Sequence, residues 1–226
     1  MVDPGPGALA PFIAGEPGTP VPLPAGTAAC FGPILDLAGG QFREEAASLD
    51  RFSAKRRREF LTGRACARAA MAALGCPAQP VGMKADGGPL WPEGLVGSIS
   101  HTSDHCIAVV GRSERCRSIG VDLEVAMGIS RSVATVVLTD AELDSYGADD
   151  RVTTLFAIKE AFFKAYYPLA GVLIDFRDVE VGLLPDGLSW CARLINPVAA
   201  SMQGRRMMTG KYRRLSGHVL AVAAVV

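Results

Sequence analysis

The residues best suited to chemistry lie in a short acidic stretch, Ile119–Glu124, which reads IGVDLE. If this stretch is a β-strand, its side chains alternate between the two faces of a sheet. The odd-numbered positions are then apolar and share one face, whereas Gly120, Asp122 and Glu124 share the other. Two carboxylates beside each other on a rigid strand suit Mg²⁺, which takes one or two carboxylates together with phosphate oxygens and water. A strand with one solvated face would show the same pattern.

A third carboxylate follows in a helix predicted over Arg151–Tyr167 and expected to end at Pro168. Glu160 and Lys164 lie four residues apart on one face of this helix. An ordinary ion pair at this spacing contributes only about 0.2–0.5 kcal/mol. Three aromatic side chains of the same face surround the pair, namely Phe156, Phe163 and Tyr167. Partial burial of a charged pair costs free energy, so we interpret Glu160 as a third acid beside the first two. Three neighbouring acids repel one another unless a cation lies among them.

Basic residues collect on an earlier helix, predicted over Ser53–Leu74 with Ser53 as its N-cap. The run Lys55–Arg58 is compatible with a solvated helix start. Arg64 lies between two small residues, where a ligand can approach closely, and arginine suits bidentate phosphate contact. His101 ends a predicted strand after Ser100; a lone histidine is more often structural, but both side chains can donate to phosphate.

Composition limits the classes of function. The 226 residues carry equal numbers of basic and acidic side chains, 23 of each, which argues against nucleic acid or an anionic membrane as the main partner. The six cysteines are scattered and form no CxxC pair, so we expect no zinc site and a reduced, cytoplasmic protein. No secretory signal is visible after Met1, and the apolar tail Val219–Val226 is too short to span a membrane.

The order of predicted elements indicates an α+β fold built from two similar halves. Each half has one long helix followed by paired strands, and the motif S-x-H-x-apolar-Ala-Val occurs twice, at Ser103–Val110 and Ser216–Ala223. A short helix capped by Thr139, with Glu142 as capping-box partner, is expected between the acidic strand and the second long helix. Two halves within one chain would leave a ligand cleft between them, and they favour a monomer. We predict three segments: a Pro/Gly-rich extended arm (1–29), an N-terminal half (30–117) and a C-terminal half (118–226).

Together these motifs resemble the 4′-phosphopantetheinyl transferases of the Sfp type. The resemblance rests on SISH (98–101), GVDLE (120–124) and IKEAFFKA (158–165), in the family's order. RRREFLTGRACAR (56–68) and GGPLWPEGLVGS (87–98) are similar to the subgroup that contains the enterobactin-synthetase transferase and actinobacterial relatives. Phe156 stands where many members have Trp, and Gly88 where many have Lys; Lys84 of the same loop is then the substitute.

The resemblance implies a fold, a reaction and partners. The fold is two α/β subdomains related by pseudo-two-fold symmetry, each a long helix on a small, mostly antiparallel sheet. Coenzyme A donates its phosphopantetheine arm to a serine of an acyl or peptidyl carrier domain of a fatty-acid, polyketide or nonribosomal-peptide synthase. Mg²⁺, or Mn²⁺, is implied on Asp122, Glu124 and Glu160. Glu160 is the implied general base, and Lys164 neutralises developing charge.

The resemblance also implies a set of coenzyme A contacts. Arg56, Arg64 and His101 would hold the 3′-phosphate, with Ser100 and the Lys84–Ala85 loop near the nucleotide. Asp122, Glu160 and Lys164 would face the pyrophosphate, and Lys159 is a further phosphate candidate. Two other classes of function stay open from the residues: a noncatalytic protein that binds coenzyme A or another nucleotide, and a metal-dependent phosphohydrolase that uses water in place of the carrier serine.

Overall fold

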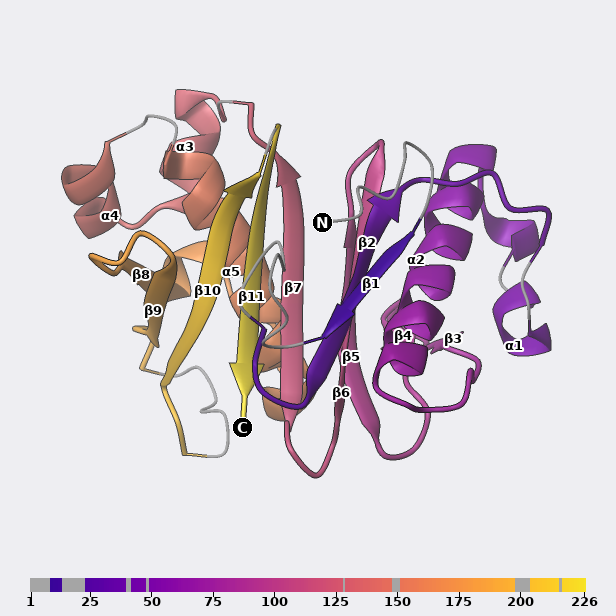
Figure 1. The fold of residues 1–226 in the computed structure, drawn as a ribbon. Helices are drawn as coiled ribbons and strands as arrows, with labels where there is room; N and C mark the ends of the chain where they lie inside the picture. The colour runs from indigo at the N-terminus through magenta and orange to yellow at the C-terminus, as the bar shows by residue number, and fades with distance from the viewer. Residues whose placement is uncertain are drawn as a thin grey trace. The chain divides into compact units, whose positions relative to one another are not determined.

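The computed structural model describes residues 9–13, 23–39, 42–47, 49–127, 129–147, 151–197, 204–215 and 217–226. The chain divides into two compact units, the first ending at Cys116 and the second comprising Arg117–Val226. Each unit has one long helix and one large antiparallel sheet (Figure 1). The α+β class expected from the sequence is therefore confirmed.

The first unit is built on a four-stranded antiparallel sheet in the order β1-β2-β6-β5. Its strands are β1 (Ala10–Ile13), β2 (Thr27–Pro33), β5 (Leu95–His101) and β6 (His105–Arg112). The long helix α2 (Ala54–Ala73) covers one face. The remaining elements are α1 (Arg43–Ala46), the 3₁₀ turn η1 (Leu49–Arg51) and the small hairpin of β3 (Gly82–Met83) and β4 (Pro89–Leu90).

Helix α2 begins and ends where the sequence predicts. The Ser53 side chain accepts a hydrogen bond from the Arg56 backbone N–H (3.3 Å), and Gly75 has φ +69° just past the end, as a helix stop requires. At Gly63 an added Cβ would lie 2.9 Å from Ile99 of β5. Gly63, the small residue before Arg64, therefore allows the helix to pack closely on the sheet. It does not provide the ligand access that was expected there.

Part of the predicted N-terminal arm takes part in the sheet. β1 pairs with β2 along Ala10–Ile13, and β2 begins at Thr27, within the predicted arm. Residues 1–8 and 14–22 of the arm lie outside the described residues. Short apolar runs in a Pro- and Gly-rich segment carry little periodicity, so the pairing partner decides their structure.

The second unit is built on a five-stranded antiparallel sheet in the order β7-β11-β10-β9-β8. Its strands are β7 (Ser118–Val125), β8 (Val179–Leu183), β9 (Ser189–Leu194), β10 (Met207–Leu215) and β11 (His218–Val225). The long helix α5 (Arg151–Ala170) packs on β7 and β11. Shorter elements are α3 (Arg131–Val137), α4 (Asp140–Tyr146) and the 3₁₀ turn η2 (Phe176–Asp178).

Two predictions about these helices have different outcomes. Thr139 and Glu142 form the expected capping box, each side chain accepting from the other's backbone N–H. The prediction that Pro168 ends the second long helix is wrong, because α5 continues through Ala170. Pro168 lies in the last turn, where its missing N–H removes only one helical hydrogen bond, and Gly171 still donates to the Tyr167 carbonyl (2.9 Å).

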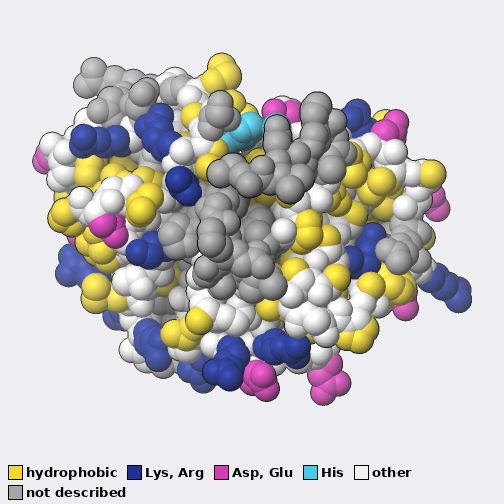
Figure 2. Space-filling view, in the orientation of Figure 1, with side chains coloured by type: hydrophobic (Ala, Val, Ile, Leu, Met, Phe, Trp, Pro, Cys, Tyr) yellow, Lys and Arg dark blue, Asp and Glu magenta, His cyan; other side chains and the backbone are white. Residues whose placement is uncertain are grey.

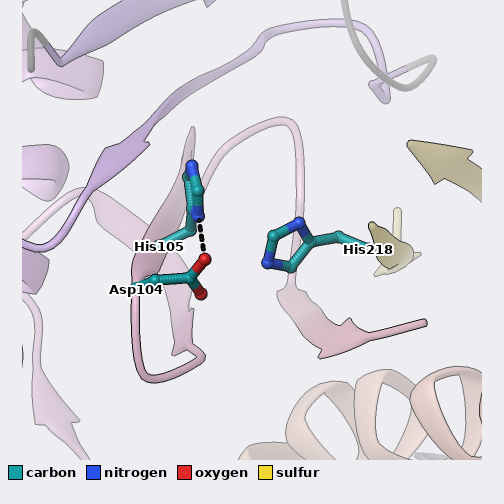
Figure 3. A group of neighbouring side chains, drawn as sticks. All are labelled: Asp104, His105 and His218. Atoms are coloured by element: carbon teal, nitrogen blue, oxygen red, sulfur yellow. Dashed lines mark ion pairs between the residues drawn. The ribbon is translucent and has the colours of Figure 1, made fainter. Parts of the chain in front are cut away.

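The two halves contain hairpins with the same strand-pairing register. The hairpins β5–β6 and β10–β11 begin their second strands at His105 and His218, the histidines of the repeated motif (Figure 3). Gly97 is paired with Val110, and Gly210 with Ala223. The same number of residues separates the members of each equivalent pair, so the hairpins match residue by residue. Ser216 of the motif lies outside the described residues.

The histidine of the first hairpin has a local partner. Nδ1 of His105 lies 3.0 Å from Oδ2 of Asp104, the ion pair drawn in Figure 3. The His105 ring stacks on Phe31 of β2, with centroids 5.2 Å apart. The first contact lies within the turn between β5 and β6, and the second holds that turn against β2.

Further matches extend the repeat beyond the hairpins. The turn between β3 and β4 and the turn between β8 and β9 both contain Asp-Gly, with the glycine at positive φ (Gly87 +87°, Gly187 +66°). The aspartate Oδ1 in each accepts a backbone N–H two residues on, at 2.9 Å. A Cβ on Gly97 would clash with the Trp91 ring, and a Cβ on Gly210 would clash in the same way with the Trp190 ring. The matching order of elements supports two similar subdomains.

Among the described residues, no helix is both long and apolar enough to cross a membrane. On the described part of the face shown in Figure 2, basic and acidic side chains are interspersed, in agreement with the zero formal net charge.

Helix α5 and strand β7 touch at Gly120, and this contact is testable. A Cβ on Gly120 would lie 1.8 Å from the Ala161 carbonyl oxygen and 2.7 Å from the Ala165 nitrogen. Because both are backbone atoms that cannot move aside alone, Gly120→Ala should lower the free energy of unfolding by at least roughly 1–3 kcal/mol, measured by urea denaturation. Gly39→Ala is the control, since a Cβ there meets nothing within 4 Å. Equal stability of the two variants would contradict this packing.

Candidate functional site

The acidic strand and the second long helix bring one cluster together in the second unit. Asp122 on β7 is 2% exposed, and its Oδ1 accepts a hydrogen bond from Nζ of Lys164 on α5 at 2.6 Å. Lys164 also donates to the Val121 carbonyl (3.2 Å). The face shared by Gly120, Asp122 and Glu124 is the face that α5 covers. The glycine thus makes room for the helix, which carries Glu160 and Lys164 to the strand acids.

The pKa shifts of Glu124 and Glu160 are those expected of carboxylates that lie near one another. Burial raises the pKa of Glu124 to about 7, with the Asp122 and Glu160 charges acting in the same direction and Lys164 opposing them. Burial also raises the pKa of Glu160, and Asp122 adds to the shift while Lys164 reduces it. We call Asp122, Glu124 and Glu160 the acid cluster. One lysine against three carboxylates leaves excess negative charge when all three are ionised, and carboxylate oxygens are the hard donors that a divalent cation prefers.

A small pocket opens beside Glu160. Its volume is about 140 Å³, and its walls come from α5 and from the segment that leads into β8. The lining residues are Lys159, Glu160, Phe163, Ile174, Asp175, Phe176 and Val179. The largest part of this wall is apolar, so the pocket suits an uncharged portion of a ligand whose charged portion lies at the acid cluster.

A second cluster lies in the first unit, where α2 meets the end of β5. Nη1 of Arg56 donates to Nε2 of His101 at 2.7 Å. Glu59 joins them, with its Oε2 3.6 Å from Arg56 Nη1 and 3.7 Å from His101 Nε2. We call Arg56, Glu59 and His101 the His101 cluster. Arginine and histidine side by side at a half-exposed surface can receive an anion such as phosphate.

Glu59 was not predicted as a site residue, although its spacing from Lys55 and Arg56 is that of helix ion pairs. Ser100 also differs from expectation. Because side chains alternate along a strand, the Ser100 side chain lies on the face of β5 opposite that of His101, and it is 6% exposed. The two neighbours in sequence therefore do not present their side chains together.

Arg64 has a structural role that its sequence position did not suggest. It is 6% exposed, its guanidinium donates to the carbonyls of Val81 and Gly82 (2.9 Å each), and it lies 4.0 Å above the Phe60 ring. Burial lowers its pKa to about 10, which leaves it charged at neutral pH. Arg64 thus holds the backbone just before Lys84, and direct phosphate contact by it stays a prediction.

Lys84 and Ala85 are exposed at the tip of the β3–β4 hairpin. The tip is a tight turn, in which Gly87 N–H donates to the Lys84 carbonyl (3.0 Å) and Lys84 N–H to the Gly88 carbonyl (2.8 Å). The positive φ of Gly87 closes it. An exposed lysine on a fixed turn is well placed to meet a charged ligand.

Lys159 is buried, and its contacts argue against the predicted phosphate contact. Its Nζ donates to Glu142 Oε2 (2.7 Å) and to the carbonyls of Val137 and Phe176 (2.9 Å each). An ammonium has three N–H donors, and all three have acceptors inside the second unit. No sequence pattern predicts this pairing, because Glu142 and Lys159 meet only through the fold.

Comparisons with known proteins agree with the motifs. Residues 44–111 match the family model described as the 4′-phosphopantetheinyl transferase N-terminal domain, and residues 118–222 match the 4′-phosphopantetheinyl transferase superfamily. The chain is 37% identical over 193 residues to 4′-phosphopantetheinyl transferase Svp of Streptomyces mobaraensis, covering 81% of this chain and 77% of that protein. It is 34% identical over 194 residues to PptT of Mycobacterium tuberculosis (81% and 84%) and 31% identical over 212 residues to enterobactin synthase component D of Salmonella typhimurium (85% of each).

The raised pKa of Glu124 predicts how stability depends on pH without metal. The folded protein keeps this proton up to about pH 7, whereas the unfolded chain releases it near the model-peptide value of about 4.3. The folded state therefore binds more protons in that window, and the free energy of unfolding should fall as pH rises through it. Urea denaturation with a chelator at several pH values should show this fall for the native protein relative to Glu124→Gln. Glu114→Gln, at an exposed turn, is the control; parallel curves for native protein and Glu124→Gln would refute the coupling.

Proposed function

The chain belongs to the 4′-phosphopantetheinyl transferase superfamily, and we propose that its acid cluster and His101 cluster carry out transfer of the 4′-phosphopantetheine arm of coenzyme A to a carrier-protein serine. The protein is a 4′-phosphopantetheinyl transferase. The observation that carries the site assignment is the acid cluster itself: three coupled carboxylates, two with raised pKa values, beside Lys164.

Asp122, Glu124 and Glu160 would hold Mg²⁺, and the same oxygen donors also suit Mn²⁺. The raised pKa values of Glu124 and Glu160 support this assignment, because a cation would offset the cost of burying their charges and the repulsion between them. When bound, the ion supplies charge neutralisation and polarisation at the pyrophosphate of coenzyme A.

The transfer is a phosphoryl transfer between oxygens, so positioning and charge stabilisation supply most of the catalysis. Glu160 accepts the proton of the carrier serine, directly or through one water, as the serine oxygen attacks the β-phosphorus. The serine O–P bond forms, the pyrophosphate P–O bond breaks, and adenosine 3′,5′-bisphosphate leaves. The raised pKa of Glu160 brings its proton affinity closer to the working pH, which favours a general base. Lys164 stabilises the charge that develops on the phosphate oxygens.

The nucleotide end is assigned to the first unit. Arg56 and His101 would bind the 3′-phosphate, since they contact each other and both already lie near an anionic group, the Glu59 carboxylate. Lys84 and Ala85 would lie along the nucleotide from their hairpin tip, and Arg64 would keep that hairpin in place through Val81 and Gly82. Ser100 would contribute through its backbone.

The uncharged middle of the substrate has a matching surface. The pocket beside Glu160 is lined by Phe163, Ile174 and Phe176. We assign to it a part of the pantetheine arm, which carries amides and methyl groups but no charge. An arm held there would stay connected to a β-phosphate at the acid cluster.

The carrier is proposed to be a domain of a fatty-acid, polyketide or nonribosomal-peptide synthase. One relative bears the name enterobactin synthase component D, which supports a siderophore-type synthase among these. None of the six cysteines, all within the described residues, forms a disulfide. That state supports work in the reducing cytoplasm.

The acid-cluster roles are tested by Glu160→Gln and Asp122→Asn. Glu160→Gln keeps the side-chain volume but loses the charge and the proton acceptor, so transfer should fall by roughly 10²–10⁴ while coenzyme A binding weakens but persists. Asp122→Asn should abolish metal-dependent transfer, because it removes a ligand charge without removing a core side chain. The measurements are calorimetry with Mg²⁺ and coenzyme A, and the intact mass of the carrier.

Glu114→Gln serves as control. Near-native transfer by Glu160→Gln would reduce Glu160 to a structural partner of Lys164. The same assay separates the functions left open by the sequence. Transfer adds the phosphopantetheinyl mass to the carrier, hydrolysis consumes coenzyme A without that addition, and a noncatalytic protein leaves coenzyme A intact.

The 3′-phosphate assignment is tested by comparing coenzyme A with dephospho-coenzyme A. A charge-assisted hydrogen bond contributes roughly 1.5–3 kcal/mol, so Arg56→Ala should weaken coenzyme A binding about tenfold or more. The same variant should affect dephospho-coenzyme A far less. Arg64→Ala should weaken both ligands equally, because it loosens the hairpin; Arg58→Ala, on the exposed side, is the control. Loss confined to coenzyme A in Arg64→Ala would instead show that Arg64 touches the phosphate.

A further inference from the structure

Glu142, on the short helix α4, is a buried carboxylate that the reaction as described does not use. It is 1% exposed. Its Oε2 accepts from Lys159 Nζ (2.7 Å) and from the Thr139 backbone N–H (2.7 Å), and its Oε1 accepts from the Val181 N–H (2.7 Å). One carboxylate therefore connects its own helix to α5 and to the outer strand β8. A capping box alone requires only the Thr139 contact.

The contacts of Glu142 and Lys159 hold both walls of the pocket beside Glu160 in place. On the helix side, Lys159 is the residue directly before Glu160. On the other side, Lys159 holds the Phe176 carbonyl and Glu142 holds Val181, two residues beyond Val179. Phe176 and Val179 line the pocket together with Glu160 and Phe163. The spacing between α5 and the opposite wall is thus set by one buried ion pair.

The first unit contains the same arrangement. Glu45, on short helix α1, is fully buried, pairs with Arg68 of α2 (2.5 Å) and accepts from the Val81 N–H (3.2 Å). Val81 leads into the hairpin that carries Lys84. In both units, a glutamate on a short helix, a cation on the long helix and a valine N–H meet in the same chain order. This recurrence indicates a feature of the subdomain plan, and in each unit it lies next to residues assigned to the reaction.

We propose that Glu142 is a positioning residue for Glu160, acting through Lys159 and Val181 to set the pocket in which the general base works. The inference rests on the role proposed above for Glu160. Glu142 itself touches neither the substrate nor the acid cluster in this arrangement. Its removal should therefore misplace Glu160 and the pocket wall without changing recognition of the 3′-phosphate by the first unit.

The test uses the full chain with two variants and a control on the same helix. Glu142→Gln keeps the volume but removes the charge that faces Lys159. Glu142→Leu/Lys159→Met removes both charges, so that no unpaired ion is buried, but it also removes the hydrogen bonds to Val181, Val137 and Phe176. Asp140→Asn is the control, because Asp140 is on α4 but its side chain is 85% exposed. Circular dichroism and cooperative urea unfolding verify that each variant is folded.

We expect kcat for transfer to fall by about tenfold or more in both variants, since small displacements of a reacting group have large effects on rate. The ratio of kcat/KM for coenzyme A to that for dephospho-coenzyme A should stay within about twofold of native. Amide exchange at Val181 should become faster. Mn²⁺ binding to the protein alone should weaken several-fold, because Glu160 is a proposed ligand. Asp140→Asn should match the native protein in all four.

Folded Glu142→Gln with native kcat and native Mn²⁺ affinity would overturn the inference. So would loss of the preference for coenzyme A over dephospho-coenzyme A in Glu142→Leu/Lys159→Met while Glu142→Gln keeps native kcat, because Lys159 would then bind phosphate directly. A native protein that leaves the carrier mass unchanged would refute the proposed function instead. In that case Mn²⁺ affinity and Val181 exchange still decide whether Glu142 positions Glu160.

Discussion

The close packing of α5 on β7 at Gly120 is the constraint on which the second unit's chemistry depends. The space of a side chain at this position is filled by the Ala161 carbonyl, so helix and strand approach as nearly as their backbones allow. Glu160 precedes Ala161, and Lys164 follows one turn later; both therefore arrive beside Asp122 and Glu124. Core packing over the whole of α5 holds together carboxylates that repel one another. Burial raises the pKa values of Glu124 and Glu160, and the repulsion from neighbouring carboxylates adds to the shift.

The repeat shows how one plan serves different chemistry. Cys30 on β2 is paired with Ala108, and Asp122 on β7 is paired with Ala221, at matching places of the two hairpins. Where the second unit sets Asp122 against Lys164, the first sets Cys30 in contact with Cys66 of its long helix. The hydrogen bond to Cys66 and burial raise the pKa of the Cys30 thiol, which stays neutral. A thiol core needs no cation, so the first unit can keep its charges at the end of β5 and on the hairpin.

Two buried ion pairs of this protein lie where helices contact one another and a neighbouring segment. Glu45 with Arg68 and Glu142 with Lys159 each bind a backbone N–H of a segment next to a proposed substrate contact. Replacing one partner of such a pair leaves an uncompensated charge, whereas replacing both can be nearly neutral. Their value is therefore in geometry: a hydrogen-bonded carboxylate has directional contacts that an apolar side chain lacks.

The sequence alone determined the elements with strong local signals and the residue types of the acid cluster. Ser53 and Gly75 mark α2, the capping box of Thr139 and Glu142 marks α4, and the alternation over Ile119–Glu124 predicted that Asp122 and Glu124 share a face. These are contacts between residues a few positions apart, which a pattern can encode.

Tertiary structure decided what lies against them. It took Lys159 and Arg64 into structural hydrogen bonds, brought His101 to Arg56 and Glu59, and extended α5 past Pro168. Each of these outcomes depends on partners distant in sequence or on packing energy larger than a local preference, and neither quantity is written in the spacing of residues.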